Sequence, residues 1–250
     1  MMLIKSAFKS AHTVNCTMNQ QHLSMVFIPG FMLDESLWDE LIPQLPHTWN
    51  FFRASLKHGQ TIDEIAEHIL HNAPPRFVLV GFSLGGYIAR TIAQKYPERI
   101  SALILVASSL RADSEKQKQF KIAAIQAASA GTFHGLSKTA ISKSLHPNQA
   151  DNRKLIQRIQ DMGKHLGFDT FKAQSLLDRS HIRSDAIQCP ILIISAAQDR
   201  LRSQEEAQEL HQSIAHSQLY TIENTGHMIP LEQPEALAAS MLKWLNTLPL

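Results

Sequence analysis

The sequence reads GFSLGG at residues 81–86, between the apolar run Phe77–Val80 and an amphipathic stretch with helical periodicity. A serine on such a strand-to-helix turn is held in a strained backbone conformation that exposes its hydroxyl group. The residues two positions before and after it must be small, and Gly81 and Gly85 are. Because the turn lies at a helix N-terminus, backbone N–H groups favour developing negative charge there. The pattern predicts Ser83 as a catalytic nucleophile, the alternative being a glycine-rich turn whose serine only caps the helix.

Further apolar runs of strand length alternate with helical patterns along the chain. The runs are Met25–Ile28, Ala102–Val106, Ile191–Ile194, the weaker Leu219–Ile222 and the short Phe51–Phe52. Strands that are apolar on both sides belong to a sheet covered on both faces, and such sheets are parallel. Helix starts are indicated at Thr61 and Ser203, each with Glu three residues on, and at Pro234. The predicted fold class is α/β, a doubly wound, mostly parallel sheet.

The alternation stops between residues 111 and 183, where helical patterns follow one another without a strand. This stretch carries 13 Lys and Arg against 6 Asp and Glu, a net charge of +7. We predict an N-terminal tail at 1–24, a core formed by 25–110 and 184–250, and a helical cap at 111–183 inserted in that core. A cap of this kind lies over the site and excludes water from it.

A serine nucleophile needs a general base that is itself oriented by an acid. Hydrolases that carry the serine on such a turn place Ser, then Asp or Glu, then His along the chain. Asp199 follows the run Ile191–Ile194, and His227 follows Leu219–Ile222. Both lie where strands end, the edge at which open α/β sheets place their sites. We therefore predict His227 as the base and Asp199 as the acid, with Asp113 as the main rival for the acid.

An acyl-transfer site also needs backbone donors for an oxyanion. The N–H of Leu84, directly after the nucleophile, is one candidate, and the N–H of Phe31, in the loop after the first strand, is the other. Apolar side chains expected to bind substrate are Phe31, Phe82, Met162, Phe168 and Phe171. At helical spacing, those of the insertion can equally pack the cap onto the core.

Five motifs carry a resemblance to a known family: PGF at 29–31 with Trp38, GFSLGG at 81–86, YPERISALILVAS at 96–108, CPILIISAAQDRL at 189–201 and GHMIPLEQPEAL at 226–237. The chain resembles the small bacterial serine α/β-hydrolases over residues 25–245. Members of that group include carboxylesterases, enol-lactonases, carbon–carbon-bond hydrolases, cofactor-free haloperoxidases and the methyl esterase that acts on pimeloyl carrier protein. The resemblance implies the α/β-hydrolase fold and a Ser-Asp-His triad, and it implies the substrate only weakly.

Two loops depart from the pattern of that family. The first loop has Ile28-Pro29-Gly30 where many relatives have histidine before glycine, so we expect it to lack a side-chain hydrogen bond that shapes it. The loop at 53–59 replaces the usual D-x-P-G-x-G-x-S. Relatives that dehalogenate or open epoxides use an aspartate nucleophile, and the serine at position 83 excludes that chemistry.

Composition gives no sign of a nucleic-acid or membrane partner, since the 250-residue chain has a net charge of only +2. No metal-ligand spacing, dinucleotide motif or P-loop occurs, so no metal and no cofactor is expected. The two cysteines, Cys16 and Cys189, form no paired motif. Residues 1–24 lack the apolar block of a signal peptide, which favours a cytoplasmic protein.

The sequence thus predicts an enzyme that cleaves a carboxylic ester or lactone through an acyl-enzyme. The alternatives are a carbon–carbon-bond hydrolase or lyase with the same triad, and a catalytically weak ligand-binding relative. The substrate is expected to be a small ester or lactone, with an anionic or carrier-protein-bound form suggested by cations of the insertion: Arg111, Lys116, Lys118, Lys121, Arg153, Lys154 and Arg158. The plainer explanation of these charges is solvated helix faces.

Overall fold

The structure, a computed structural model, describes residues 22–128, 131–183 and 186–250. Most of the predicted N-terminal tail, including Cys16, therefore lies outside the described residues. The first strand begins at Ser24, one residue earlier than the sequence indicated. Within the described ranges, no helix is both long and apolar enough to cross a membrane.

Six strands form one parallel sheet in the order β2-β1-β3-β4-β5-β6. They are β1 (Ser24–Ile28), β2 (Asn50–Arg53), β3 (Phe77–Phe82), β4 (Ile100–Val106), β5 (Ile191–Ala196) and β6 (Ser217–Ile222). Each of the six predicted apolar runs lies in one of these strands. The prediction of a doubly wound parallel α/β sheet is confirmed.

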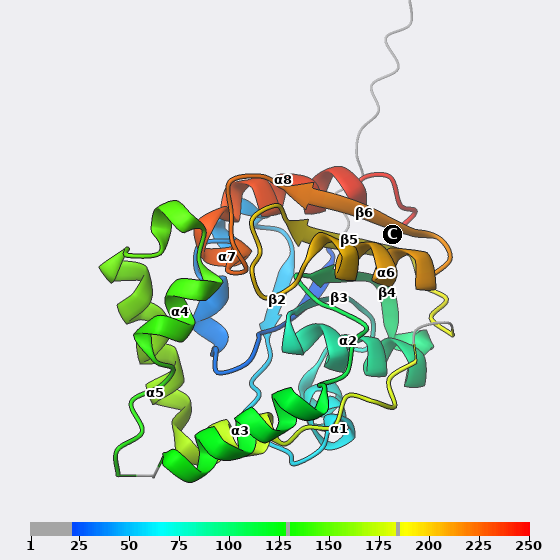
Figure 1. Ribbon diagram of the computed structural model, residues 1–250. Coiled ribbons are helices and arrows are strands. Elements are labelled where there is room, and N and C mark those ends of the chain that lie inside the picture. Colours follow the sequence, from blue (N-terminus) through cyan, green and yellow to red (C-terminus); the bar gives the residue numbers. More distant parts are fainter. Residues whose placement is uncertain (1–21, 129–130, 184–185) are drawn as a thin grey trace, which may run out of the picture.

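Helices cover both faces of the sheet (Figure 1). One face carries α1 (Ile62–Asn72), α2 (Leu84–Lys95) and α6 (Gln204–Ser213), and the other carries the 3-10 turns η1 (Glu35–Trp38) and η2 (Ile42–Gln44) with α7 (Ile229–Glu232) and α8 (Pro234–Leu245). A further 3-10 turn, η3 (Pro97–Arg99), leads from α2 into β4. Thr61 and Ser203 cap α1 and α6 through the backbone N–H groups of Glu64 and Glu206, so the predicted helix starts are confirmed.

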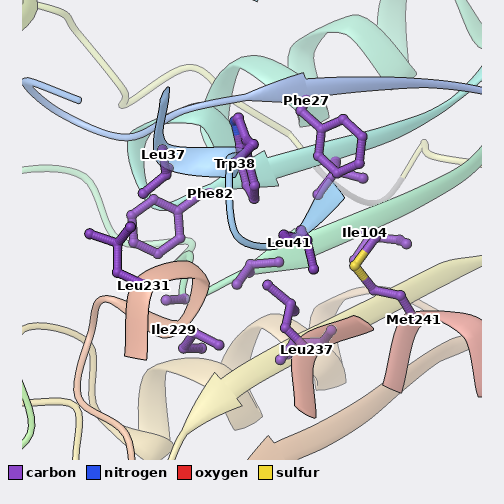
Figure 2. Packing of buried hydrophobic residues seen from close by; sticks show 14 of the residues in the cluster. Phe27, Leu37, Trp38, Leu41, Phe82, Ile104, Ile229, Leu231, Leu237 and Met241 are labelled. Carbon is purple, nitrogen blue, oxygen red and sulfur yellow. The ribbon is translucent and has the colours of Figure 1, made fainter. Parts of the chain in front are cut away.

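Alternating side chains of each buried strand feed two separate cores. In β3, Phe77 and Leu79 pack toward α1 and α2, whereas Val80 and Phe82 pack toward α8 and η1. Figure 2 shows this second core, in which Phe82 lies beside Leu37 and Trp38, with Leu237 and Met241 of α8 below. Burial on both faces explains why the strands read as continuous apolar runs.

Between β4 and β5 the described residues form helices and no strand. These are α3 (Glu115–Ala127), α4 (Lys138–Ser144), the 3-10 turn η4 (Pro147–Gln149) and α5 (Arg153–Ser175). They group on one side of the sheet (Figure 1). The backbone of α5 is broken at Gly167, whose φ of 82° is left-handed. We call residues 111–183 the helical insertion.

Candidate active site

Ser83 stands between β3 and α2 with φ 50° and ψ −110°, a strained conformation for a residue with a side chain, at a cost of about 1–3 kcal/mol. The flanking glycines are needed because the backbone is crowded. A Cβ on Gly81 would lie 2.6 Å from the carbonyl oxygen of Gly85. A Cβ on Gly85 would lie 2.4 Å from the carbonyl oxygens of Ile28 and Pro29. The first loop therefore runs directly beside the turn that carries Ser83.

The structure brings Ser83, His227 and Asp199 together although they are far apart in sequence. Ser83 Oγ lies 2.9 Å from His227 Nε2, and Asp199 Oδ2 lies 2.7 Å from His227 Nδ1. The three residues follow β3, β6 and β5, so they meet at the carboxyl edge of the sheet. His227 is 4% exposed and Ser83 is 9% exposed, so water has little access to the hydrogen bonds between them.

The hydrogen bonds around Asp199 fix the proton on the imidazole. Asp199 Oδ1 already accepts from the backbone N–H groups of Leu201 and Arg202, at 2.7 and 2.9 Å. Its Oδ2 is thus left to accept from His227 Nδ1–H, which leaves Nε2 free to accept the hydroxyl proton of Ser83. This is the arrangement in which a neutral imidazole can act as a general base.

Asp113, the rival acid, lies elsewhere. Its carboxylate accepts from Lys121 Nζ and lies 3.7 Å from the guanidinium of Arg179. Both partners belong to the helical insertion, so Asp113 contributes to an ion-pair cluster between the end of the core and α3. The structure gives it no contact with His227.

The end of α4 is hydrogen-bonded to the loops that carry the acid and the base. The backbone N–H of His227 donates to the carbonyl of Ser144 at 2.7 Å. The guanidinium of Arg200, next to Asp199, donates to the carbonyl of Ser142 at 2.7 Å. The insertion therefore holds both loops from the outside.

Glu232 makes the third link, and the sequence analysis did not find it. Its carboxylate accepts from the backbone N–H of His146 at 2.7 Å and of Gly226 at 2.9 Å, with the Thr225 hydroxyl at 3.3 Å. The segment GHMIPLEQPEAL contains it, but no local pattern connects position 232 with position 146. One partly buried carboxylate thus joins the His227 loop to the insertion.

Burial raises the pKa of the Glu232 carboxyl above its ordinary value of 4.5, although the three hydrogen bonds oppose the shift. A raised folded pKa means that the folded state holds the proton more tightly than the unfolded state. This contribution to stability is therefore full below about pH 4.5 and is lost as the pH rises through the folded pKa. The unfolding free energy of the wild type minus that of Glu232→Gln should fall as the pH rises above 4.5, in urea titrations at several pH values. A difference that stays flat or rises with pH would contradict this assignment.

Three of the predicted substrate-binding residues lie together. The rings of Phe31 and Phe171 are 6.0 Å apart, and those of Phe168 and Phe171 are 6.3 Å apart. Phe133, which the sequence analysis missed, contacts both rings of α5, at 6.0 Å from Phe168 and 5.0 Å from Phe171. We call Phe31, Phe133, Phe168 and Phe171 the aromatic cluster. It joins the first loop to the insertion.

The other two predicted contacts lie apart from the aromatic cluster. Phe82 is fully buried, with its ring 5.1 Å from the His227 ring. It therefore packs against the imidazole from the core side. Met162 is buried in the main core and lines a groove of about 760 Å³ between η1 and α5, together with Arg153, Lys154 and His165.

Comparison with known proteins identifies the family. The α/β hydrolase fold family matches residues 58–234, and the chain belongs to this family and is a hydrolase enzyme. It is 26% identical to a pimeloyl-(acyl-carrier protein) methyl ester esterase of Neisseria meningitidis, over 85% of this chain and 73% of that protein. The corresponding Klebsiella pneumoniae protein is 33% identical over 37% of this chain and 39% of that protein.

Solved structures agree in fold. An esterase from Thermogutta terrifontis superposes with a TM-score of 0.77 at 23% identity, covering 90% of both chains. The enol-lactonase from Burkholderia xenovorans has a TM-score of 0.77 at 17% identity, covering 90% of this chain and 92% of that chain. At these identities the likeness establishes the fold and leaves the substrate to be argued from the site.

Proposed function

We propose that the protein hydrolyses a carboxylic ester, with Ser83 as nucleophile, His227 as general base and Asp199 as the residue that orients the imidazole. The observation that carries the proposal is the chain of hydrogen bonds from Ser83 Oγ through His227 to Asp199, at 2.9 and 2.7 Å. A relative that only binds a ligand would not need Ser83, His227 and Asp199 to be hydrogen-bonded in this order. All three lie at the edge of the sheet where this family performs catalysis.

The chemistry follows from those positions. Ser83 Oγ attacks the ester carbonyl carbon while its proton passes to His227 Nε2. The tetrahedral intermediate then collapses, the carbon–oxygen bond to the alcohol breaks, and the imidazolium gives its proton to the departing oxygen. Water, deprotonated by the same imidazole, attacks the acyl-enzyme, and the carboxylic acid leaves with Ser83 restored.

Two backbone amides are proposed to hold the oxyanion. The N–H of Leu84 opens α2, where four helix N–H groups have no partner inside the helix. The N–H of Phe31 belongs to the first loop, which is in contact with Gly85 of the same turn. In this proposal the two N–H groups point to the same side of Ser83, as a tetrahedral oxyanion requires.

The insertion is proposed to act as a cap that supplies the acyl pocket. Its Phe133, Phe168 and Phe171 meet Phe31 of the first loop, so the aromatic cluster gives apolar walls next to the proposed oxyanion donor. Two of the relatives are named as esterases for a methyl ester of an acyl group on a carrier protein. We therefore favour a methyl ester with an unbranched acyl chain over a lactone or a carbon–carbon bond.

Covalent labelling tests the proposal directly. The wild type is treated with a fluorophosphonate, its adduct is measured by intact mass, and peptide mapping locates the modified residue. In parallel, turnover of methyl butyrate, methyl octanoate, a γ-lactone and a vinylogous 1,5-diketone is compared. A single adduct on Ser83 with turnover of the methyl esters supports the proposal. A folded protein that is neither labelled nor active on any ester would overturn it and favour a ligand-binding protein.

A carrier-bound substrate would be attracted by positively charged side chains that have no acidic partner, and few of the predicted cations meet that condition. Of the seven cations considered, four form ion pairs with acidic side chains: Arg111 with Glu209, Lys118 with Glu115, Lys121 with Asp113 and Arg158 with Glu40. Within the described residues, the other three, Lys116, Arg153 and Lys154, form no ion pair. Arg153 and Lys154 are exposed at the start of α5 and line the groove beside η1.

Reversing both charges (Arg153→Glu with Lys154→Glu) is expected to lower kcat/KM for pimeloyl-carrier-protein methyl ester about tenfold at low salt, because steering by unpaired charges raises the association rate. Turnover of p-nitrophenyl butyrate should not change. In 0.5 M salt the wild type and the variant should differ little in kcat/KM for the carrier-bound ester, because charges are screened beyond a Debye length of about 4–5 Å. Lys116→Glu is the control, because Lys116 is an exposed cation on α3 that forms no ion pair within the described residues. It changes the net charge by −2, whereas the double variant changes it by −4. A loss of about threefold in Lys116→Glu, which is half of the tenfold loss on a logarithmic scale, would mean that net charge alone matters.

A further inference from the structure

We infer that Gln174 is a positioning residue for the loop that carries the oxyanion donor Phe31. This inference rests on the proposed function. Gln174 lies near the end of α5 and is 1% exposed. Its side-chain oxygen accepts from the backbone N–H of Met32 at 2.8 Å, and its side-chain nitrogen donates to the carbonyl of Leu56 at 3.2 Å. The amide therefore joins the insertion to two loops of the core.

The first loop needs such a partner because its backbone is strained. The N–H of Leu33 donates to the carbonyl of Gly30 at 3.2 Å, which closes a turn with Phe31 and Met32 at its centre. Met32 has φ 55°, a left-handed conformation that is unfavourable for a residue with a branched or long side chain. Met32 is also fully buried, so without Gln174 its N–H would lie in an apolar setting with no acceptor. Loss of the amide thus removes the contact that opposes relaxation of the turn.

Relaxation of that turn acts on the proposed oxyanion donor. The Met32 N–H that Gln174 holds belongs to the Phe31–Met32 peptide, and the Phe31 N–H belongs to the peptide before it, Gly30–Phe31. Rotation of the Phe31–Met32 peptide changes the backbone torsions at Phe31, on which the direction of the Phe31 N–H depends. An oxyanion hole is effective only while its donors are held in place before reaction. The effect of Gln174 is therefore on the transition state, and it reaches the reacting atoms through the loop.

Gln174 contacts both loops that depart from the family pattern. The expectation that the first loop lacks a side-chain hydrogen bond was wrong, because Gln174 of the insertion supplies one. Leu56, the second partner, lies in the 53–59 loop that replaces the D-x-P-G-x-G-x-S segment. A primary amide is the side chain that offers one acceptor for an N–H and one donor for a C=O at the same place.

A second bridge runs parallel to this one nearer the surface. His165 Nδ1 lies 2.8 Å from Asp34 Oδ2, and His165 Nε2 lies 3.2 Å from Lys57 Nζ. It joins the same two loops to α5, but the His165 side chain is 60% exposed, so water competes for both contacts. The buried amide is therefore the contact that fixes the first loop.

The test compares an ester with its thiono analogue, in which sulfur replaces the carbonyl oxygen. Sulfur is a weak hydrogen-bond acceptor, so the thiono substrate gains little stabilisation from the oxyanion donors. For Gln174→Leu, kcat for p-nitrophenyl butyrate should fall about 10- to 100-fold with little change in KM, less than for loss of a donor itself. Turnover of the thiono analogue should fall much less. The ratio of the two rates therefore reports on the oxyanion hole. A general loss of structure would lower both rates and leave the ratio unchanged.

Two further variants complete the design. Ser175→Ala is the matched control, since Ser175 is the next residue of α5, is buried, and has no hydrogen-bond partner within the described part of the chain. It should leave the rate ratio unchanged. Gln174→Glu keeps an acceptor for the Met32 N–H and, when protonated, a donor for the Leu56 carbonyl. It should retain most of the wild-type ratio even where its Tm is lowered. If Gln174→Leu does not fold, Gln174→Met, which keeps an unbranched side chain of similar length without the amide, takes its place and should change the ratio in the same direction.

The outcomes separate the two proposals. A wild type that is active and labelled at Ser83, with the same rate ratio in Gln174→Leu and Ser175→Ala, would overturn the positioning role alone. The same holds if Gln174→Glu loses the ratio as far as Gln174→Leu does. A wild type with no activity and no labelling at Ser83 would overturn the proposed function.

Discussion

Ser83→Ala is expected to lower kcat for ester hydrolysis by on the order of 10⁶-fold, as removal of a nucleophile from an assembled triad does. The acyl-enzyme cannot form without Oγ, and His227 then has no proton to remove. The residual rate comes from the oxyanion donors and from substrate binding alone. Fluorophosphonate labelling should vanish together with turnover. Stopped-assay kinetics at high enzyme concentration and intact mass give the two readouts.

The folded state should survive the change. Alanine keeps the Cβ at the strained φ of 50°, and the hydroxyl that is removed contacts only His227 among the hydrogen bonds of this turn. We expect the Tm to stay within a few degrees, or about 1 kcal/mol, of the wild type. Ser240→Ala, on α8 and remote from the site, is the matched control and should keep full activity. Substantial turnover by a folded Ser83→Ala variant would exclude Ser83 as the nucleophile.

The sequence predicts the sheet well because each buried strand has a hydrophobic pattern within its own few residues. β1, β3, β4 and β5 are buried on both faces, so each is a continuous apolar run that ends near a small or polar residue. The turn at Ser83 is equally local, since its strain depends on Gly81 and Gly85 within two residues. The weakest prediction concerned β2, an edge strand in which no residue is fully buried. A half-exposed edge leaves little hydrophobic pattern to detect.

Contacts between the insertion and the core are the feature of the site that sequence patterns do not predict. Gln174 meets a loop 142 positions earlier, and Glu232 meets His146 from 86 positions away. A single polar residue on a helix has the same local signature whether it faces solvent or a buried backbone amide. Phe133 was missed for a related reason, because it lies outside any helix and has no periodic partner. The residues proposed for chemistry are therefore locally encoded, whereas those that hold them in place depend on the tertiary fold.

Asp199→Asn is expected to lower kcat about 10⁴-fold while leaving the fold intact. The asparagine oxygen still accepts from the N–H groups of Leu201 and Arg202, so the loop keeps its shape. The amide nitrogen then faces His227 Nδ1 and donates to it, which places the imidazole proton on Nε2. In that tautomer His227 cannot accept the proton of Ser83, and the imidazolium loses its negative neighbour.

Asp113→Asn is the matched control for this change. Asp113 was the rival acid in the sequence, but it interacts with Lys121 and Arg179 in the structure. Its loss should change kcat less than about threefold, while it lowers the Tm because the buried Arg179 guanidinium loses its carboxylate partner. Steady-state kinetics of both variants on one methyl ester, with Tm as the check on folding, decide between the two carboxylates. Should Asp113→Asn lose activity while Asp199→Asn keeps it, the orienting acid would have to act from the end of β4. The imidazole would then have to turn away from the Asp199 oxygen that now lies 2.7 Å from it and give up that hydrogen bond in a buried site.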